Sequence, residues 1–236
     1  MGAKRKISDR SALKDFYDNG CTLEGFDDAR VLSMLFEDLF GSKKYDNVKL
    51  AETLLNEFRS VSGVLYASPK ALGKTNTLEY ADIVKLKYMS AFYKVVMLER
   101  CKLPIKLSDE EGIAKRLGAL FSGETQELLY IFPVVGKRIV SEFLIDSGNE
   151  NSINISMRRI SDRLDTAENC TSFIMAHNHP DGVCKPSEND IIMTGKIYTE
   201  MEQKGYKLLK HYLYTRDEIT TIPVESSHMA YFFGNK

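Results

Sequence analysis

The sequence predicts an α/β (α+β) protein in which a helical N-terminal domain precedes a mixed-sheet domain. Apolar residues recur at helical spacing through about the first hundred residues. After Cys101–Pro104, short runs rich in β-branched and aromatic residues alternate with amphipathic helical patterns. Such alternation is typical of a sheet covered by helices. We therefore expect a helical domain over residues 1–103 and a mixed-sheet domain over residues 104–230.

The N-terminal half contains helical patterns that end at turn signals. Two of them cover Ala29–Leu39 and Val48–Phe58, and each places its apolar residues on one face. Gly41 and Gly63 are the expected stops after these two helices. A longer helix is expected over Tyr80–Arg100.

The C-terminal half predicts strands and helices in mixed order. A turn at Gly136-Lys137 separates the first two strands, and the last helix is expected to bury Ile191, Gly195, Tyr198 and Met201. In chain order, the elements are a helix near Asp109–Leu120, strands over Leu128–Val135 and Ile139–Leu144, a helix over Met157–Ala167, a strand over Ser172–Ala176, a helix over Glu188–Lys204, and strands over Tyr206–Tyr214 and Ile219–Val224.

The composition is that of a globular protein without a strong net charge. Lys and Arg total 32 against 33 acidic residues, so no overall excess of charge points to nucleic acid. The four cysteines are scattered, which favours reduced thiols over a disulfide framework. No apolar run approaches the roughly 20 residues that a membrane span needs, and no secretory signal follows the basic N-terminus. We therefore expect a cytoplasmic protein without a membrane segment.

The stretch from His177 to Asp190 carries the clearest chemistry in the chain. His177 and His179 stand two residues apart at the end of a predicted strand, so both rings can reach one ion. Asp190 lies in the first turn of the following helix. Two imidazoles and a carboxylate are ligands of the kinds that zinc takes, and a catalytic zinc keeps its fourth position for water. The pattern predicts one Zn²⁺ per chain, with water as fourth ligand.

This stretch resembles a motif of a known enzyme family. His-x-His, seven residues, Ser187, two residues and Asp190 follow the JAMM metallopeptidase motif of the JAB/MPN domain. The neighbouring His-Asn-His-Pro and Pro-Ser sequences are most similar to the bacterial RadC branch. The resemblance extends to the glutamate-bearing stretch Gln126–Leu128, and upstream to residues 28–36 and 60–69, so that residues 25–222 can be followed approximately.

The resemblance implies a fold, a reaction and two catalytic residues. It implies a JAB/MPN domain of the cytidine-deaminase-like type and zinc-dependent hydrolysis of a peptide or isopeptide-like amide bond. Glu127 matches the family's general base, which a zinc hydrolase needs to take a proton from water. Ser187 matches the serine that stabilises the tetrahedral oxyanion. The expected ligands are His177, His179 and Asp190.

Plainer interpretations of these residues stay open. Ser187 and Asp190 also have the spacing of a helix N-cap and its capping-box partner. Glu127 is alternatively a solvated charge at a strand edge, with Glu124 as the nearest competitor for the role of base. The histidine pair alone is also compatible with a polar strand end.

Two further residues of metal-binding types, Cys184 and His211, lie near the motif but are not expected to be ligands. Cys184 lies inside the motif loop, and thiolates bind zinc well, but we interpret it as a tolerated loop residue. His211 matches a histidine of the family's late strand, where Lys210 replaces the usual preceding aspartate. We expect His211 to support the site and not to bind the ion.

Two classes of function therefore compete. The first is a zinc metallopeptidase. The second is a DNA-associated accessory protein of repair or recombination, without peptidase activity, as the resemblance to RadC implies. The resemblance implies a DNA-binding hairpin with two glycines, which would lie in Leu72–Tyr80. This stretch keeps Gly73 but lacks the second glycine, which would let backbone amides approach a phosphate. The sequence identifies neither the substrate nor the oligomeric state.

Overall fold

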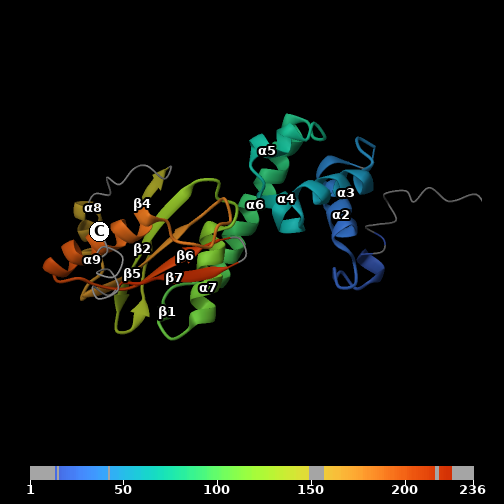
Figure 1. Ribbon diagram of the computed structural model, residues 1–236. Helices are drawn as coiled ribbons and strands as arrows, with labels where there is room; N and C mark the ends of the chain where they lie inside the picture. The colour runs from blue at the N-terminus through green and yellow to red at the C-terminus, as the bar shows by residue number, and fades with distance from the viewer. Residues whose placement is uncertain (1–13, 15, 42, 149–156, 216–217, 225–236) are drawn as a thin grey trace, which may run out of the picture. The chain divides into compact units, whose positions relative to one another are not determined.

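The computed structural model of the chain divides into two compact units, Met1–Tyr93 and Lys94–Lys236 (Figure 1). It describes residues 14, 16–41, 43–148, 157–215 and 218–224. The division falls within one long helix, α6 (Tyr80–Arg100). The domain boundary expected between residues 103 and 104 remains a prediction, and residues 225–230 of the second expected domain lie outside the described part.

The first unit is helical, as the spacing of its apolar residues predicts. It contains α2 (Asp28–Phe40), α3 (Asn47–Phe58), α4 (Val61–Tyr66), α5 (Pro69–Lys74) and most of α6. Side chains of Asp27, Asp46, Ser60 and Ser68 cap the first four of these helices by accepting backbone N–H groups. Their apolar faces meet in one core around Leu32, Phe36, Leu54 and Leu86.

One expected helix stop in this unit is wrong. Gly41 ends α2 with a positive φ of 87°, as expected, but α3 ends at Arg59, which itself takes the left-handed conformation. Gly63 lies inside α4, where an added Cβ would come 2.0 Å from the Phe58 carbonyl oxygen. A close backbone approach, and not a helix end, therefore explains this glycine.

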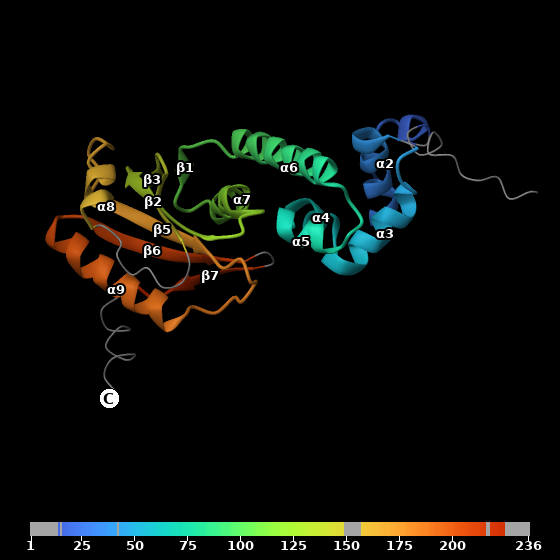
Figure 2. The same ribbon diagram turned by 90° about the horizontal axis from the view of Figure 1, so that it is seen from above.

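The second unit is a mixed sheet with helices on both faces (Figure 2). Its strand order is β1-β3-β2-β5-β6-β7, and β4 pairs with β2. β5 and β6 are parallel, and the other pairs are antiparallel. The elements are β1 (Ile105–Lys106), α7 (Glu110–Phe121), β2 (Glu127–Val135), β3 (Arg138–Ile139), β4 (Phe143–Gly148), α8 (Met157–Leu164), β5 (Ser172–Asn178), α9 (Glu188–Gln203), β6 (Lys207–Tyr214) and β7 (Ile219–Ile222).

Two apolar cores hold the helices on the sheet. On one face, Ile113 and Leu117 of α7 pack with Phe132 and Ile174. On the other, α8 and α9 pack through residues such as Ile160 and Ile197 against Ile131, Phe173 and Met175. The predicted fold class, a helical N-terminal region followed by a mixed sheet with helices, is confirmed.

The single strand expected over Ile139–Leu144 is wrong, because the chain forms β3 and β4 with a break between them. Both strands pair with β2, and the Pro133 carbonyl accepts the Val140 N–H at 3.0 Å where they separate. Proline has no N–H to return to this ladder. The break therefore follows from Pro133 on the neighbouring strand, which the pattern of residues 139–144 does not show.

The expected buried stripe of α9 is shifted by one position over most of its length. Asp190, Thr194, Ile197 and Met201 are buried, whereas Ile191, Gly195 and Tyr198 are only partly buried. The observed buried stripe begins with two polar residues, Asp190 and Thr194, so the spacing of apolar residues alone cannot locate it. Within the described residues, no helix is long and apolar enough to cross a membrane.

Candidate metal centre

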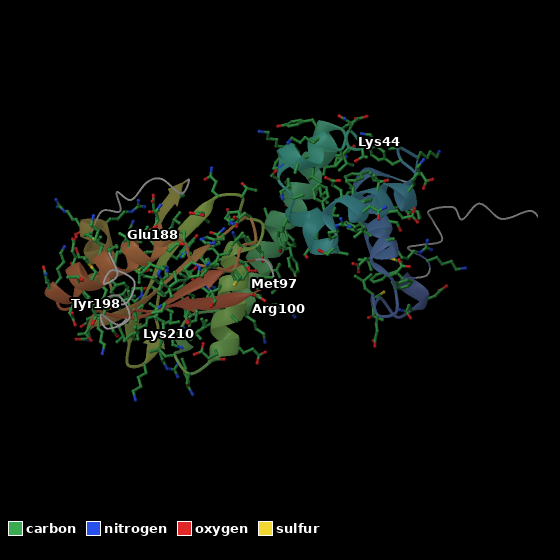
Figure 3. All side chains as sticks on the ribbon, in the orientation of Figure 1. Lys44, Met97, Arg100, Glu188, Tyr198 and Lys210 are labelled. Atoms are coloured by element: carbon green, nitrogen blue, oxygen red, sulfur yellow. The ribbon has the colours of Figure 1, made fainter. Side chains whose placement is uncertain are left out.

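The histidines, the aspartate and the glutamate of the motif come from three elements. β5 carries His177 and is followed directly by His179, α9 begins two residues before Asp190, and β2 begins with Glu127. Leu129 of β2 lies opposite His177 of β5, which brings Glu127 at the start of β2 to the end of β5, where its charge acts on His179. The site thus lies between the carboxyl end of β5 and the amino end of α9. Figure 3 labels Glu188 in the first turn of this helix.

Three side chains come together tightly enough to hold one ion. The Nε2 atoms of His177 and His179 lie 3.3 Å apart. Asp190 Oδ1 lies 3.2 Å from His177 Nε2, and Oδ2 lies 3.2 Å from His179 Nε2. Ligand atoms at about 2.0–2.1 Å from a tetrahedral zinc lie about 3.3 Å from one another. The donor types suit zinc, and one ligand atom from each residue lies within 4.8 Å of the others, so the trio could hold one metal ion; within the described residues it is the one group of its kind.

His211 determines how His177 presents its ring. His211 Nδ1 lies 2.7 Å from Thr194 Oγ1, whose hydroxyl donates to the Asp190 carbonyl at 2.6 Å. Since that hydroxyl proton is already engaged, Thr194 accepts from His211 Nδ1–H, and His211 Nε2 accepts from His177 Nδ1–H at 2.8 Å. Burial lowers the pKa of His211, which keeps its ring neutral. This hydrogen-bond chain leaves the Nε2 lone pair of His177 for a ligand.

His179 is oriented in the same way by the backbone. Its Nδ1 donates to the Val183 carbonyl at 2.9 Å, so its Nε2 faces Asp190. The hydrogen bond to Asp190 raises the pKa of His179 to about 9, although burial opposes this, and the Glu127 carboxylate adds to the rise. Burial favours the neutral form of Asp190, yet its close contacts with the rings of His177 and His179 and the hydrogen bond from Ser187 hold the pKa of this carboxyl well below its ordinary value. The Asp190 carboxylate therefore stays charged between the two rings.

Asn178, between the two histidines, fixes the backbone around Glu127. Its side-chain oxygen accepts the Leu128 N–H at 2.8 Å, and its amide donates to the Gln126 carbonyl at 3.1 Å. The peptide groups on both sides of Glu127 are therefore tied to the end of β5, between the two histidines. Neither Asn178 nor Thr194 has a role that the motif spacing predicts.

Ser187 is the N-cap of α9, as its plainer interpretation predicts. Its Oγ accepts the Asp190 N–H at 3.1 Å and donates to Asp190 Oδ2 at 2.7 Å, and Asp190 Oδ2 also accepts the Ser187 N–H. This capping box holds the aspartate at the helix start, where the helix dipole favours a negative charge. The hydroxyl proton is thus engaged with Asp190.

The remaining residues considered from the sequence lie outside the trio. Glu124 forms an ion pair with Lys94 of α6. Cys184 is partly buried in the motif loop, and its pKa is raised by burial and by Glu218. In the turn after α5, Thr75 Oγ1 donates to the Leu72 carbonyl at 2.7 Å, so a side chain closes the turn at the position of the missing second glycine. DNA binding through this turn remains a prediction.

Comparison with known proteins places this unit in a family. Residues 108–226 match the family model described as RadC-like JAB domain. A UPF0758 protein of Fusobacterium nucleatum is 26% identical over 226 residues, covering 92% of this chain and 95% of that protein. UPF0758 proteins of Cupriavidus taiwanensis and Chromobacterium violaceum are 24% and 27% identical, covering 83% and 74% of this chain and 85% and 78% of their own lengths.

Proposed function

Since the chain belongs to the RadC-like JAB domain family, we propose that it is a zinc-dependent hydrolase that cleaves a peptide or isopeptide-like amide bond. The observation that carries this proposal is the buried cluster of His177, His179 and Asp190 close to Glu127. A site that only bound metal would not need a glutamate placed next to the ligands. The chain's own residues can supply most steps of hydrolysis.

Zinc held by the trio supplies Lewis-acid chemistry, which polarises a carbonyl and makes water more acidic. Glu127 takes the proton of the attacking water and later gives it to the leaving nitrogen. Asn178 keeps Glu127 in place through the two peptide groups that flank it. His211 and Val183 keep the Nε2 atoms of the two histidines directed at the ion.

Ser187 has one hydroxyl proton for two roles. In the structure this proton goes to Asp190 Oδ2. We propose that Ser187 turns its hydroxyl towards the oxyanion when substrate is bound, because a donor placed where negative charge develops is a large catalytic contribution. Ser187→Ala should then lower kcat with zinc retained. If Ser187 acted only as the N-cap, the same substitution would lower the stability of α9 by about 1 kcal/mol and leave kcat unchanged.

Metal content is the first test of the proposal. We expect about one zinc per chain in the purified protein and strong loss of zinc in His179→Ala and Asp190→Ala. Glu188→Ala is the matched control, since it removes an exposed carboxylate from the same helical turn. Equal zinc in all variants would overturn the metal site.

The general base is tested separately. A substrate is first sought by screening peptides and isopeptide-linked conjugates. Glu127→Gln should then keep zinc but lose turnover by about 100- to 10,000-fold, because the amide cannot take a proton. Glu124→Gln is the control, since Glu124 pairs with Lys94 and is expected to leave turnover unchanged. Full turnover by Glu127→Gln would remove Glu127 from the mechanism.

A further inference from the structure

A basic pocket lies at the end of β2 opposite to the metal centre. It has a volume of about 410 Å³, and five cationic side chains and one carboxylate line it: Arg100, Lys102, Lys106, Lys115, Arg138 and Asp109. β2 runs from Glu127 near the histidines to Val135, which pairs with Arg138. At about 3.4 Å per residue, the two sites lie roughly 27 Å apart. The basic pocket is therefore separate from the site already described.

The cations of this pocket are poorly neutralised by the protein. Lys106 and Arg138 lie directly opposite each other on the antiparallel strands β1 and β3, where like charges are destabilising. Among the residues that the structure describes, neither they nor Arg100 and Lys102 form an ion pair.

Two carboxylates offset only part of this charge. Asp109 lines the pocket and also caps α7 by accepting the Gly112 N–H at 2.9 Å, and Glu111 pairs with Lys115 at 2.5 Å, against five cations. A nearly neutral chain thus carries a local excess of positive charge in one concave place.

The backbone beneath these side chains is held firmly. Arg116 of α7 donates to the carbonyls of Leu98 and Cys101 at 2.9 and 3.0 Å, which fixes the chain around Arg100. Figure 3 labels Arg100 at the carboxyl end of α6. The Leu107 N–H bonds to the Lys137 carbonyl at 3.0 Å, which joins the two loops that continue β1 and precede β3. The cations therefore extend from preorganised elements.

We propose that this basic pocket binds a small ligand through a diphosphate group, either inorganic pyrophosphate or the diphosphate of a nucleotide. Phosphate oxygens accept the charge-assisted hydrogen bonds that Arg and Lys offer, and they relieve the repulsion between Lys106 and Arg138. The volume lies in the range of small-molecule sites. The cations converge on one pocket and do not follow a long stripe, which favours a compact anion over a nucleic-acid backbone.

Isothermal titration of the full-length protein with pyrophosphate, and separately with ADP, tests the proposal. We expect saturable binding of pyrophosphate, and tighter binding of ADP identifies a nucleotide as the source of the diphosphate. The double variant Lys106→Gln/Arg138→Gln should bind about 100-fold more weakly, or about tenfold for each charge-assisted hydrogen bond that it removes. The matched control is Lys196→Gln/Lys207→Gln, which removes two exposed cations of the same unit.

Thermal unfolding separates binding from a structural role. Because Lys106→Gln/Arg138→Gln removes a like-charge pair, its Tm without ligand should equal or exceed that of the wild type, while pyrophosphate should raise only the wild-type Tm. If that variant fails to fold, Arg100→Gln/Lys102→Gln provides the same measurement. Absence of pyrophosphate and ADP binding at about millimolar concentration, equal binding by mutant and control, or binding of a DNA duplex alone overturns the proposal.

Discussion

At the scale of single residues, the candidate metal centre depends on side chains outside the trio of His177, His179 and Asp190. His211 fixes the ring of His177, and Thr194 connects His211 to the backbone of Asp190. One hydrogen-bond chain therefore links two ligands that are thirteen residues apart in sequence. Such supporting contacts fix the tautomer of a ligating histidine and raise its basicity.

Replacing His211 should weaken metal binding without removing a ligand. We expect His211→Ala to lower zinc affinity by about 10- to 100-fold, because His177 loses the acceptor that holds its Nδ1 proton. Thr194→Val should also lower the zinc affinity, since it breaks the hydrogen-bond chain one bond further from His177. Competition with a chelator measures both affinities. Thr199→Val, on the exposed side of α9, is the control, and unchanged affinity in His211→Ala would contradict the proposed chain.

Metal affinity should also depend on pH through His179. Its pKa is raised to about 9, mainly by the hydrogen bond to Asp190, so at neutral pH a metal ion must displace a proton from the ring. The apparent zinc affinity should therefore rise about tenfold per pH unit between pH 6.5 and 8.5 and level off near pH 9. Chelator competition at several pH values tests this. A flat profile would show that His179 is already neutral in the metal-free protein.

At the scale of elements, local pattern predicts an element well when its neighbours do not interfere. α6 begins and ends where apolar spacing places it, and α9 begins at the expected Ser187 cap. By contrast, the break between β3 and β4 depends on Pro133 of the neighbouring strand. The offset of the α9 stripe has a similar cause, because Asp190 and Thr194 are buried by contacts with His177 and His211 that only the folded chain creates.

The same contrast holds for the site. The motif spacing indicates which three residues gather, but it does not indicate that Asn178 brackets Glu127, because that contact joins residues 50 positions apart. Likewise, the overall charge gives no sign of the basic pocket, since Arg138 joins the cations of residues 100–115 only through the pairing of β1 with β3.

The link between α6 and the loop after α2 provides a stability prediction. Asp82, whose side chain is fully buried, accepts from Lys44 and from the Tyr45 hydroxyl, each at 2.6 Å. Burial alone would raise the pKa of Asp82, but these hydrogen bonds and that from Lys85 lower it overall. We expect Asp82→Asn to destabilise the helical unit by about 2 kcal/mol, between the values for exposed and fully buried pairs.

Hydrogen exchange of the α3 amides measures this loss within the helical unit. Because the pKa of Asp82 is lowered on folding, its contribution is present above the ordinary value of 3.8 and is lost as the pH falls through the folded pKa. The difference in unfolding free energy between Asp82→Asn and the wild type should therefore become smaller in acid. Glu79→Gln is the matched control, since Glu79 bonds to the same lysine but is exposed, and it should cost less than about 1 kcal/mol.

At the scale of the whole molecule, α6 belongs to both units, and its last turns support the sheet domain. Leu98 and Leu103 pack against the core formed by α7 and the sheet. Arg116 of α7 donates to the carbonyls of Leu98 and Cys101, and its guanidinium also pairs with Glu142. Residues before the sequence-based boundary at 103/104 therefore accept hydrogen bonds from Arg116 and complete the apolar core of the unit that lies after it.

This arrangement predicts that the place of truncation decides the stability of the metal-binding unit. A fragment of residues 94–236 keeps Leu98 and both carbonyl acceptors of Arg116. A fragment of residues 104–236 leaves the partly buried Arg116 with only Glu142 and exposes part of the core. We expect the shorter fragment to unfold at least 2 kcal/mol more easily, since a buried charged donor loses hydrogen bonds worth about 1.5–3 kcal/mol.

Urea unfolding of the two fragments, each with zinc content measured, tests this expectation. The proposed metal ligands and their supporting residues lie within both fragments, so both should bind zinc when folded. Arg116→Met in both fragments is the control for the buried charge, because it removes the donor together with its need for acceptors. That substitution should narrow the difference in stability between the fragments, leaving the part that comes from Leu98 and Leu103. Equal stability of residues 94–236 and 104–236 would instead support a boundary at 103/104 and show that the end of α6 contributes nothing to the sheet domain.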